Sequence, residues 1–229
     1  MFSISEGPAM PDMNANLSDT GTTAPVRRGD PPPAHALQAE FDTAFGAAPA
    51  HAAGSRCVRV ALLETPLGPM LAAATHAGVC RLEFAELGGL EPSRAEMQRQ
   101  FALPIAPGTN AVLEQLRAEL REYMRGVRRG FSVPIEMRGT EFQRRVWSEL
   151  RRIPHGQTTS YEGVAQRIGS PSAARAVARA NATNCLCLVV PCHRVIAKNG
   201  ALSGYSGGVW RKPLLIALER TGRLPEHAS

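Results

Sequence analysis

Short apolar segments separated by turn residues mark the first structured part of the chain. Residues 57–63, 70–75 and 79–84 consist mainly of Val, Leu, Ala, Met and Cys. They are separated by Thr65-Pro-Leu-Gly68 and by His76-Ala-Gly78, and Pro and Gly are typical turn residues. The pattern therefore predicts three strands joined by tight turns.

Helical periodicity prevails over much of the remaining chain, where apolar residues recur every three or four positions. Asn110, Thr140, Ser160 and Ser172 stand where helices would begin, and each has a side-chain oxygen that can accept a backbone N–H of the first turn. Residues 131–137 are predicted to be extended. The predicted helices cover residues 36–45, 90–101, 111–125, 141–150, 161–168, 173–182 and 210–220.

Two of these helices are arranged like a helix-turn-helix. Residues 161–168 and 173–182 flank a short turn that contains Gly169 and Pro171. The motif places its second helix in a groove of DNA, although many helical hairpins show the same pattern. The second helix is rich in Ala, whose small side chain allows close approach to a groove without reading a particular base sequence.

Composition indicates a globular protein. Hydrophobic residues make up 44% of the 229 positions, and no apolar run is long enough to cross a membrane. Residues 1–34 are rich in Pro, Gly, Ser and Thr, so we expect a disordered leader there. The five cysteines are irregularly spaced, which argues against a disulfide framework and favours a reducing, cytoplasmic setting. Cys185 and Cys187 have no second pair to complete a zinc site, so no metal is expected.

Charge is unevenly distributed along the chain. Residues 138–229 contain 14 Lys and Arg but 5 Asp and Glu, whereas residues 1–137 contain 12 and 15. A basic second half is expected of a protein that binds a polyanion, most simply nucleic acid. A solvated basic face on a soluble protein would give the same charge, and charge alone does not separate the two interpretations.

Cys192 and His193 are the strongest chemical signal in the sequence. They follow the apolar run 186–190, which is predicted to be a short buried strand, and Pro191, which cannot continue a central strand. This arrangement would hold a thiol at the edge of the core with a base next to it, as a nucleophile requires. A buried structural cysteine beside an incidental histidine is the alternative.

Further motifs surround this pair. They are Gly139-Thr-Glu-Phe-Gln143, Val146-Trp147, Ile153-Pro154, Gly156-Gln-Thr-Thr-Ser-Tyr161, Arg175-Ala-Val177, Asn184 and Ser203-Gly-Tyr-Ser-Gly-Gly208. Together with the pentapeptide Pro191-Cys-His-Arg-Val195, they resemble the active-site region of the O6-alkylguanine-DNA alkyltransferase family. The resemblance is strong over residues 138–222 and looser over residues 57–137.

The resemblance implies an α/β fold class, in which a small ribonuclease-H-like α/β domain precedes a mainly helical domain with a winged helix-turn-helix. On this basis residues 56–137 form the N-terminal domain and residues 138–229 the DNA-binding alkyltransferase domain. Residues 35–55 are expected to be a short helix and linker. Their segment Phe41-Asp-Thr-Ala-Phe-Gly-Ala-Ala-Pro49 resembles the tail of an AraC-type helix-turn-helix, which suggests a relic of a fused regulator. An unrelated amphipathic helix explains it nearly as well.

The resemblance also implies roles for individual residues. Cys192 is the expected acceptor thiolate. His193 is its expected base, acting through a bound water, because adjacent side chains in extended backbone point to opposite faces. Glu219 is expected to orient the imidazole, and Asn184 to brace the turn between the recognition helix and the active-site loop. Tyr161 is expected to help rotate the target phosphate, contact guanine N3 and donate a proton to the leaving guanine.

Other residues are implied in binding DNA and the target base. Arg175 is expected to enter the duplex and fill the gap left by a flipped base. Taken singly, each site residue has an ordinary structural explanation, such as a helix C-cap for Asn184 or a solvent-facing position for Glu219. Further DNA contacts are assigned to Tyr161, Ser172, Ala174 and Ala178, and the guanine pocket to Trp147, Val195, Tyr205 and Ser206.

The implied reaction is the irreversible transfer of a methyl or larger alkyl group from O6 of guanine in duplex DNA to Cys192. O4 of thymine is a further candidate donor. Each molecule would act once, and no cofactor is expected. The expected partner is double-stranded DNA that contains O6-alkylguanine, and we expect a monomer that does not associate with membranes.

Asn181 stands where relatives often have an apolar residue, so a changed pocket entrance or groove contact is expected there. Cys187 lies on the segment that leads to the pocket, where it would tune access or simply pack. Three other functions stay open. A non-catalytic lesion-binding relative is disfavoured by the presence of Cys192. A transcriptional regulator that reads DNA through residues 161–182 is disfavoured by the Ala-rich helix. A Cys-His hydrolase would leave the basic half unexplained.

Overall fold

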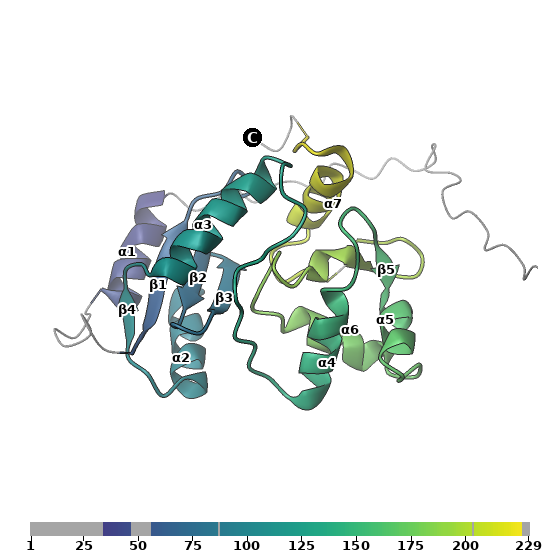
Figure 1. Cartoon of the computed structure of the whole chain (residues 1–229), viewed down its shortest axis with the longest axis horizontal. Coiled ribbons are helices and arrows are strands. Elements are labelled where there is room, and N and C mark those ends of the chain that lie inside the picture. The colour runs from purple at the N-terminus through teal and green to yellow at the C-terminus, as the bar shows by residue number, and fades with distance from the viewer. Residues whose placement is uncertain (1–33, 47–55, 87, 203, 226–229) are drawn as a thin grey trace, which may run out of the picture.

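The computed structural model describes residues 34–46, 56–86, 88–202 and 204–225. Its helices and strands form two adjoining parts (Figure 1), an α/β part built on a four-stranded sheet and a mainly helical part that contains α4 to α7. The α/β fold class predicted from the sequence is therefore confirmed. The predicted leader, except for Ala34, and most of the predicted linker lie outside the described residues.

The sheet contains the three predicted strands and a fourth that the sequence pattern did not reveal. The strands are β1 (Val58–Leu63), β2 (Met70–Ala74), β3 (Val79–Phe84) and β4 (Ile105–Pro107). They lie in the order β3-β2-β1-β4, with β1–β2 and β2–β3 antiparallel and β1–β4 parallel. Strand β4 has three residues and includes a proline, so it carries no alternating pattern that would identify it.

Helices cover both faces of the sheet. They are α1 (Ala34–Phe45), α2 (Leu90–Gln100) and α3 (Ala111–Met124). Helices α1 and α2 share one hydrophobic cluster with Leu71 and Ala73 of β2, whereas α3 shares the other with Met70 and Ala72. Successive residues of a strand point to opposite faces, which explains this division. Helix α1 buries the apolar face predicted for it, which consists of Leu37, Phe41 and Phe45.

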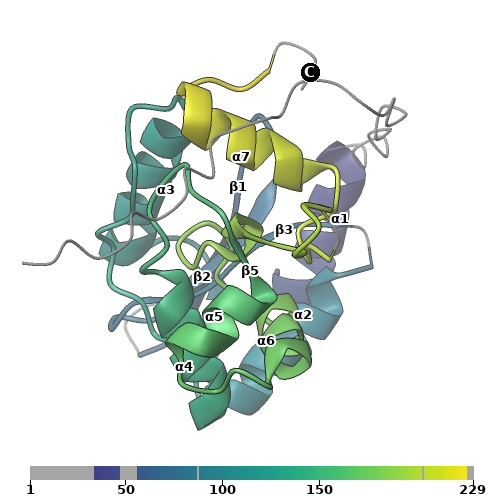
Figure 2. The same cartoon turned by 90° about the vertical axis from the view of Figure 1, so that its right-hand side faces the viewer.

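The helical part is built around the predicted helix-turn-helix. Its elements are α4 (Glu141–Leu150), β5 (Thr159–Ser160), α5 (Tyr161–Arg167), α6 (Ala174–Ala182), β6 (Val195–Ile196) and α7 (Arg211–Thr221). Helices α4, α5 and α6 pack against one another, as Figure 2 shows from the side. Gly169, with a φ of 70°, turns the chain between α5 and α6. Strands β5 and β6 form a short parallel pair.

Three of the four predicted helix caps are confirmed. Asn110 accepts a hydrogen bond from Leu113 N, Ser160 caps α5 in the same way, and Thr140 forms a reciprocal capping box at the start of α4. The prediction for Ser172 is wrong, because α6 begins one residue later and has no side-chain cap. Backbone bonding within the preceding turn takes the place of a cap and leaves Ser172 exposed.

The apolar run 186–190 is a tight loop and not the predicted buried strand. Leu186 forms an isolated bridge to Leu82 on the edge of β3. The chain then reverses at Leu188, whose φ of 71° lies in the left-handed region that leucine rarely adopts. A continuous apolar run has no periodicity that distinguishes a buried strand from a buried loop, which is why the sequence pattern was misleading here.

The two parts are joined by a continuous hydrophobic core and by one buried arginine. The core extends from α3 and the sheet to α4, α5 and α7. Arg211 of α7 is 2% exposed, and its guanidinium lies 4.3 Å from the Phe84 ring centroid and 4.4 Å from that of Trp210. It also pairs with Glu86 at 2.8 Å. These contacts attach α7 to the end of β3.

Gly126 and Gly169 offer a matched test of the packing between α3 and α7. Both have left-handed φ values, 72° and 70°, but a Cβ on Gly126 would lie 1.8 Å from Gly222 O, whereas one on Gly169 would meet nothing within 4 Å. We expect Gly169→Ala to cost about 1–2 kcal/mol and Gly126→Ala to cost several times more, because the two helix ends must separate. Denaturant unfolding measures both, and equal costs would contradict this close approach.

Candidate active site and DNA-binding surface

The Cys192 thiol is buried at the start of a 3-10 helix, Cys192–Arg194. Asn184, just after α6, donates from Nδ2 to Cys192 Sγ at 3.0 Å and to Val190 O at 2.8 Å. Its Oδ1 accepts from Leu186 N at 3.0 Å. This geometry fits the bracing role expected for Asn184. The extended backbone expected at Cys192 and His193 is wrong, because the tight loop continues directly into the 3-10 turn.

The surroundings of this thiol favour its ionised form. A hydrogen bond with Cys187 lowers the pKa of the Cys192 thiol, burial raises it, and Asn184 and the charge of Lys212 lower it further, so that the pKa lies below its usual value. The same contact raises the pKa of the Cys187 thiol, which therefore keeps its proton. Lys212 lies buried on α7. Lys212 was not predicted as a site residue, although a lysine on the inward face of a helix is a usable signal.

His193 is buried and held by Glu219 of α7. Its Nε2 lies 2.9 Å from Glu219 Oε1, whereas its Nδ1 is buried without a hydrogen-bond partner in the described part of the chain. Burial lowers the pKa of the imidazole even against the attraction of Glu219, so the neutral ring is favoured at neutral pH. A neutral ring that donates from Nε2 keeps a lone pair on Nδ1, as a base requires.

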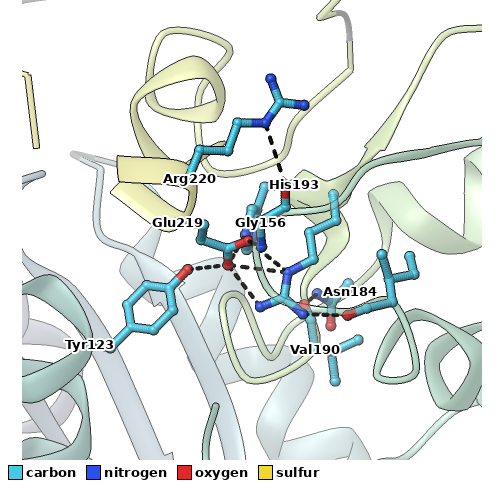
Figure 3. A network of polar contacts seen from close by, with 9 residues as sticks. Tyr123, Gly156, Asn184, Val190, His193, Glu219 and Arg220 are labelled. Carbon is cyan, nitrogen blue, oxygen red and sulfur yellow. Dashed lines mark hydrogen bonds and ion pairs between the residues drawn. The ribbon is translucent and has the colours of Figure 1, made fainter. Parts of the chain in front are cut away.

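The Glu219 carboxylate is the centre of a buried polar network (Figure 3). It accepts hydrogen bonds from Arg194 Nη2 at 2.7 Å, Tyr123 OH at 2.6 Å and Gly156 N at 2.9 Å. Although burial raises the pKa of this carboxyl, the hydrogen bonds and charges of His193 and Arg194 hold it well below its usual range. The group is therefore an ionised carboxylate, and its exposure of 6% excludes a solvent-facing position.

Two side chains of this network were not predicted as site residues. Arg194 lies within the pentapeptide beside His193, and its Nη1 also donates to Ile153 O at 2.6 Å. Tyr123 belongs to the apolar stripe of α3 and looks like a core residue in the sequence. A buried tyrosine hydroxyl needs a partner, but that partner is Glu219, 96 residues further along the chain. Only the fold reveals the pair.

The residues predicted for the guanine pocket differ in how far they are buried. Tyr205 is buried, and its ring meets that of His193 edge-on with centroids 6.4 Å apart. Burial and the neighbouring Cys187 and Cys192 thiols raise the pKa of its hydroxyl well above the usual value. Val195 is buried in β6, and Ser206 is exposed next to Tyr205. Tyr205 thus borders the imidazole, and Ser206 is open to solvent.

Tyr161 and Trp147 occupy contrasting positions. Tyr161 is the half-buried first residue of α5, and burial together with the charge of Cys192 raises the pKa of its phenol. Its hydroxyl is therefore protonated close to the thiol. Trp147 is 4% exposed and donates from Nε1 to Ala180 O at 2.8 Å. Trp147 therefore lies in the core between α4 and α6 and not in the expected pocket position, because its indole N–H is bonded to a carbonyl of α6.

Helix α6 and the turn before it carry the residues that were predicted to contact DNA. Arg175 and Ser172 are exposed, Ala174 and Ala178 are half-buried, and Val177 packs into the core. The outward face thus combines small side chains with a positive charge. Such a face can approach a DNA groove closely without base-specific contacts.

The two departures from the family pattern both lie at the Cys192 loop. Asn181 faces inward with 2% exposure, and its Nδ2 lies 3.4 Å from Cys192 O. A groove contact by Asn181 is therefore excluded in this conformation. Cys187 contacts Cys192 and also lines a cavity of about 250 Å³ together with Ser206.

The described ranges hold no group of three or more His, Cys, Asp or Glu side chains that could bind a metal ion. They also hold no helix that is long and apolar enough to cross a membrane.

The fold and the site define a protein that couples a helix-turn-helix to a buried, activated thiol. The family model described as 6-O-methylguanine DNA methyltransferase, ribonuclease-like domain, matches residues 58–137, and the model of the DNA binding domain of the same family matches residues 141–221. The methylated-DNA–protein-cysteine methyltransferase of Mycolicibacterium paratuberculosis is 42% identical over 161 residues, which cover 69% of this chain and 90% of that protein.

Other relatives agree. The constitutive methylated-DNA–protein-cysteine methyltransferase of Bacillus subtilis is 38% identical over 158 residues, which cover 69% of this chain and 92% of that protein. The crystal structure of Mycobacterium tuberculosis OGT in complex with DNA aligns with a TM-score of 0.63 at 35% identity and covers 75% of this chain and 97% of that one.

The chain therefore belongs to the 6-O-methylguanine DNA methyltransferase family. The resemblance drawn from its motifs is confirmed, and with it the enzyme class, methylated-DNA–protein-cysteine methyltransferase, a DNA-repair transferase. The predicted order of a ribonuclease-like domain followed by a DNA-binding domain is confirmed as well.

Replacement of Glu219 tests the buried network. Glu219→Gln leaves Arg194 without its buried counter-charge, and we expect it to lower the free energy of unfolding by about 3–5 kcal/mol at pH 7. The pKa of Glu219 is depressed in the folded protein. The extra stability of the wild type over Glu219→Gln is therefore present above the unfolded-state carboxyl pKa of about 4.3. It is lost as the pH falls towards the lower pKa of Glu219 in the folded protein. Denaturant unfolding of both proteins from neutral to acid pH measures it.

Glu64→Gln is the matched control, because Glu64 is exposed and exposed charges contribute little. We expect this variant to unfold like the wild type over the same pH range. The described network would be contradicted if Glu219→Gln lost no more unfolding free energy than the control. It would also be contradicted if the loss grew as the pH falls.

Proposed function

We propose that this protein repairs double-stranded DNA by transferring a methyl or larger alkyl group from O6 of guanine to Sγ of Cys192. The observation that carries the proposal is the buried thiol that accepts a hydrogen bond from Asn184 and lies next to the His193–Glu219 pair. A thiol with a lowered pKa is the nucleophile required to attack a soft alkyl carbon. O4-alkylthymine is a further substrate of the same chemistry.

The reaction consists of one proton transfer and one displacement. His193 Nδ1 accepts the thiol proton through a bound water, and Glu219 stabilises the resulting imidazolium. The Cys192 thiolate attacks the alkyl carbon, so a carbon–sulfur bond forms while the carbon–oxygen bond to guanine breaks. The guanine takes the bonding electrons and receives a proton from the Tyr161 hydroxyl, which solvent then reprotonates.

The product explains why each molecule acts once. The alkyl group ends in a thioether on Cys192, and a thioether is not hydrolysed by an imidazole or a carboxylate. Neither the displacement nor the proton transfer calls for a cofactor. The protein is therefore consumed in the reaction and repairs one base per molecule.

An O6 atom inside the duplex cannot reach a buried thiol, so the target base must leave the stack. Helix α6 enters the groove through Ser172, Ala174 and Ala178, and Arg175 fills the gap that the base leaves. Half-buried Tyr161 helps to rotate the target phosphate. The flipped guanine is then contacted by Val195, Tyr205 and Ser206. We further propose that the protein acts as a monomer in a reducing, intracellular compartment that keeps Cys192 a free thiol.

Cys192→Ala should abolish transfer from a duplex that carries a labelled O6-methyl group and should leave binding to that duplex intact. Cys185→Ala is the matched control, because Cys185 is a half-buried cysteine near the same loop whose thiol contacts Cys80 O and not the site. It should retain transfer. Label on the Cys192→Ala protein would assign the acceptor to another cysteine.

DNA binding should weaken steeply with salt. The logarithm of the binding constant should fall linearly with the logarithm of the salt concentration, with a slope of about 0.9 for each neutralised phosphate.

Arg175→Ala should slow transfer from duplex DNA more than transfer from the free O6-alkylguanine base, because the free base needs no flipping. Binding titrations and transfer rates with both substrates measure this. A flat salt response, or an equal loss on both substrates, would remove α6 from the mechanism.

A further inference from the structure

Tyr123 connects the α/β part of the molecule to the catalytic carboxylate. It lies on α3, far in sequence from the site, and its side chain is 1% exposed. Its hydroxyl donates to Glu219 Oε1 at 2.6 Å, and Figure 3 shows the ring reaching across to that oxygen. The same Oε1 lies 2.9 Å from His193 Nε2. One carboxylate oxygen therefore interacts with both the phenol and the imidazole.

The ring of Tyr123 has little freedom to move. Phe131 stacks on it at a tilt, with centroids 5.2 Å apart, and His155 meets it edge-on at 6.2 Å. Helix α3 is itself fixed, because Leu116 and Leu120 are buried in the core. The hydroxyl is therefore held at Oε1 by α3 and by the packing of Phe131 and His155, none of which belongs to the loop that carries Cys192.

The phenol of Tyr123 acts as a donor at every physiological pH. Burial and the charge of Glu219 raise its pKa well above the usual value, so it keeps its proton. A hydrogen bond donated to Glu219 Oε1 withdraws negative charge from that oxygen. Less charge then remains to stabilise the imidazolium form of His193.

We propose that Tyr123 is a positioning residue through which the N-terminal part sets the basicity of His193. This inference rests on the proposed function, in which neutral His193 accepts the thiol proton of Cys192. Tyr123 keeps the basicity of the imidazole low, so the ring stays neutral before reaction, and it holds the carboxylate in place when the imidazolium forms.

Other charged groups face the same carboxylate and histidine. Arg194 donates to both oxygens of Glu219, and the charge of Lys212 lowers the pKa of His193. His155 interacts electrostatically with Glu219, and burial lowers its pKa. His155 is therefore a second group whose titration has to be separated from that of His193.

The test is the pH profile of the transfer rate. The full-length wild type and Tyr123→Phe react with a duplex that contains O6-methylguanine, over a series of pH values. Phenylalanine keeps the ring packing but removes the hydroxyl, so the pKa of His193 should rise. The acid limb of the profile is the pH range in which the rate falls because His193 becomes protonated. It should therefore move to higher pH by roughly half a unit or more. A limb that stays in place would overturn the inference.

A second variant is expected to move the acid limb in the opposite direction. The residue 3-fluorotyrosine, introduced at position 123 alone, keeps the hydroxyl and makes it a stronger donor. The acid limb should then move to lower pH. A role in packing alone predicts the same profile for both replacements, and it would also make Tyr123→Phe differ from wild type only in thermal stability. The fluorinated protein keeps both the ring and the hydroxyl, so it gives an answer even if Tyr123→Phe folds poorly.

Two controls remove the competing explanations. Phe131→Leu disturbs the packing of the same ring without removing the hydroxyl, and it should lower stability without moving the limb. His155→Gln should leave the limb in place, and a limb that disappears would assign the titration to His155 and overturn the inference. If wild-type protein transfers no methyl group at any pH, the proposed function itself fails, which distinguishes the two failures.

Discussion

The whole site depends on burying the negative charge of Glu219. A carboxylate inside a protein is costly unless cations and hydrogen-bond donors surround it. Here the partners are Arg194, His193, Gly156 and Tyr123, which come from three separate segments, because His193 and Arg194 are neighbours in the 3-10 turn. The fold has to bring all four to one point on α7. The close approach of α3 and α7 and the buried Arg211 that attaches α7 to β3 are therefore conditions for the catalytic geometry.

The nucleophile is held by a different part of the same framework. Asn184 follows the recognition helix directly and donates to both Cys192 Sγ and Val190 O. The thiol is thus attached to the end of α6, the helix that presents Arg175 outward. A helix seated in a DNA groove would therefore determine where the thiol lies with respect to the duplex. DNA recognition and the proposed transfer chemistry would therefore share one rigid element.

Local signals in the sequence predicted most of the elements, because strand runs, helix periodicity and caps such as Thr140 are properties of neighbouring residues. The motifs likewise located Cys192, His193 and Asn184. What sequence reasoning missed depends on tertiary neighbours. The partner of Tyr123 is distant in the chain, and the loop at Leu188 adopts a left-handed backbone that no apolar pattern announces.

The most direct test of the account is mass spectrometry of the full-length protein after incubation with a duplex that contains a single O6-methylguanine. Intact-protein mass gives the number of methyl groups per chain, and peptide mapping gives their position. The account predicts one added methyl group, located on the peptide that contains Cys192. An unmodified protein that still binds the duplex, or a methyl group on another cysteine, would contradict it.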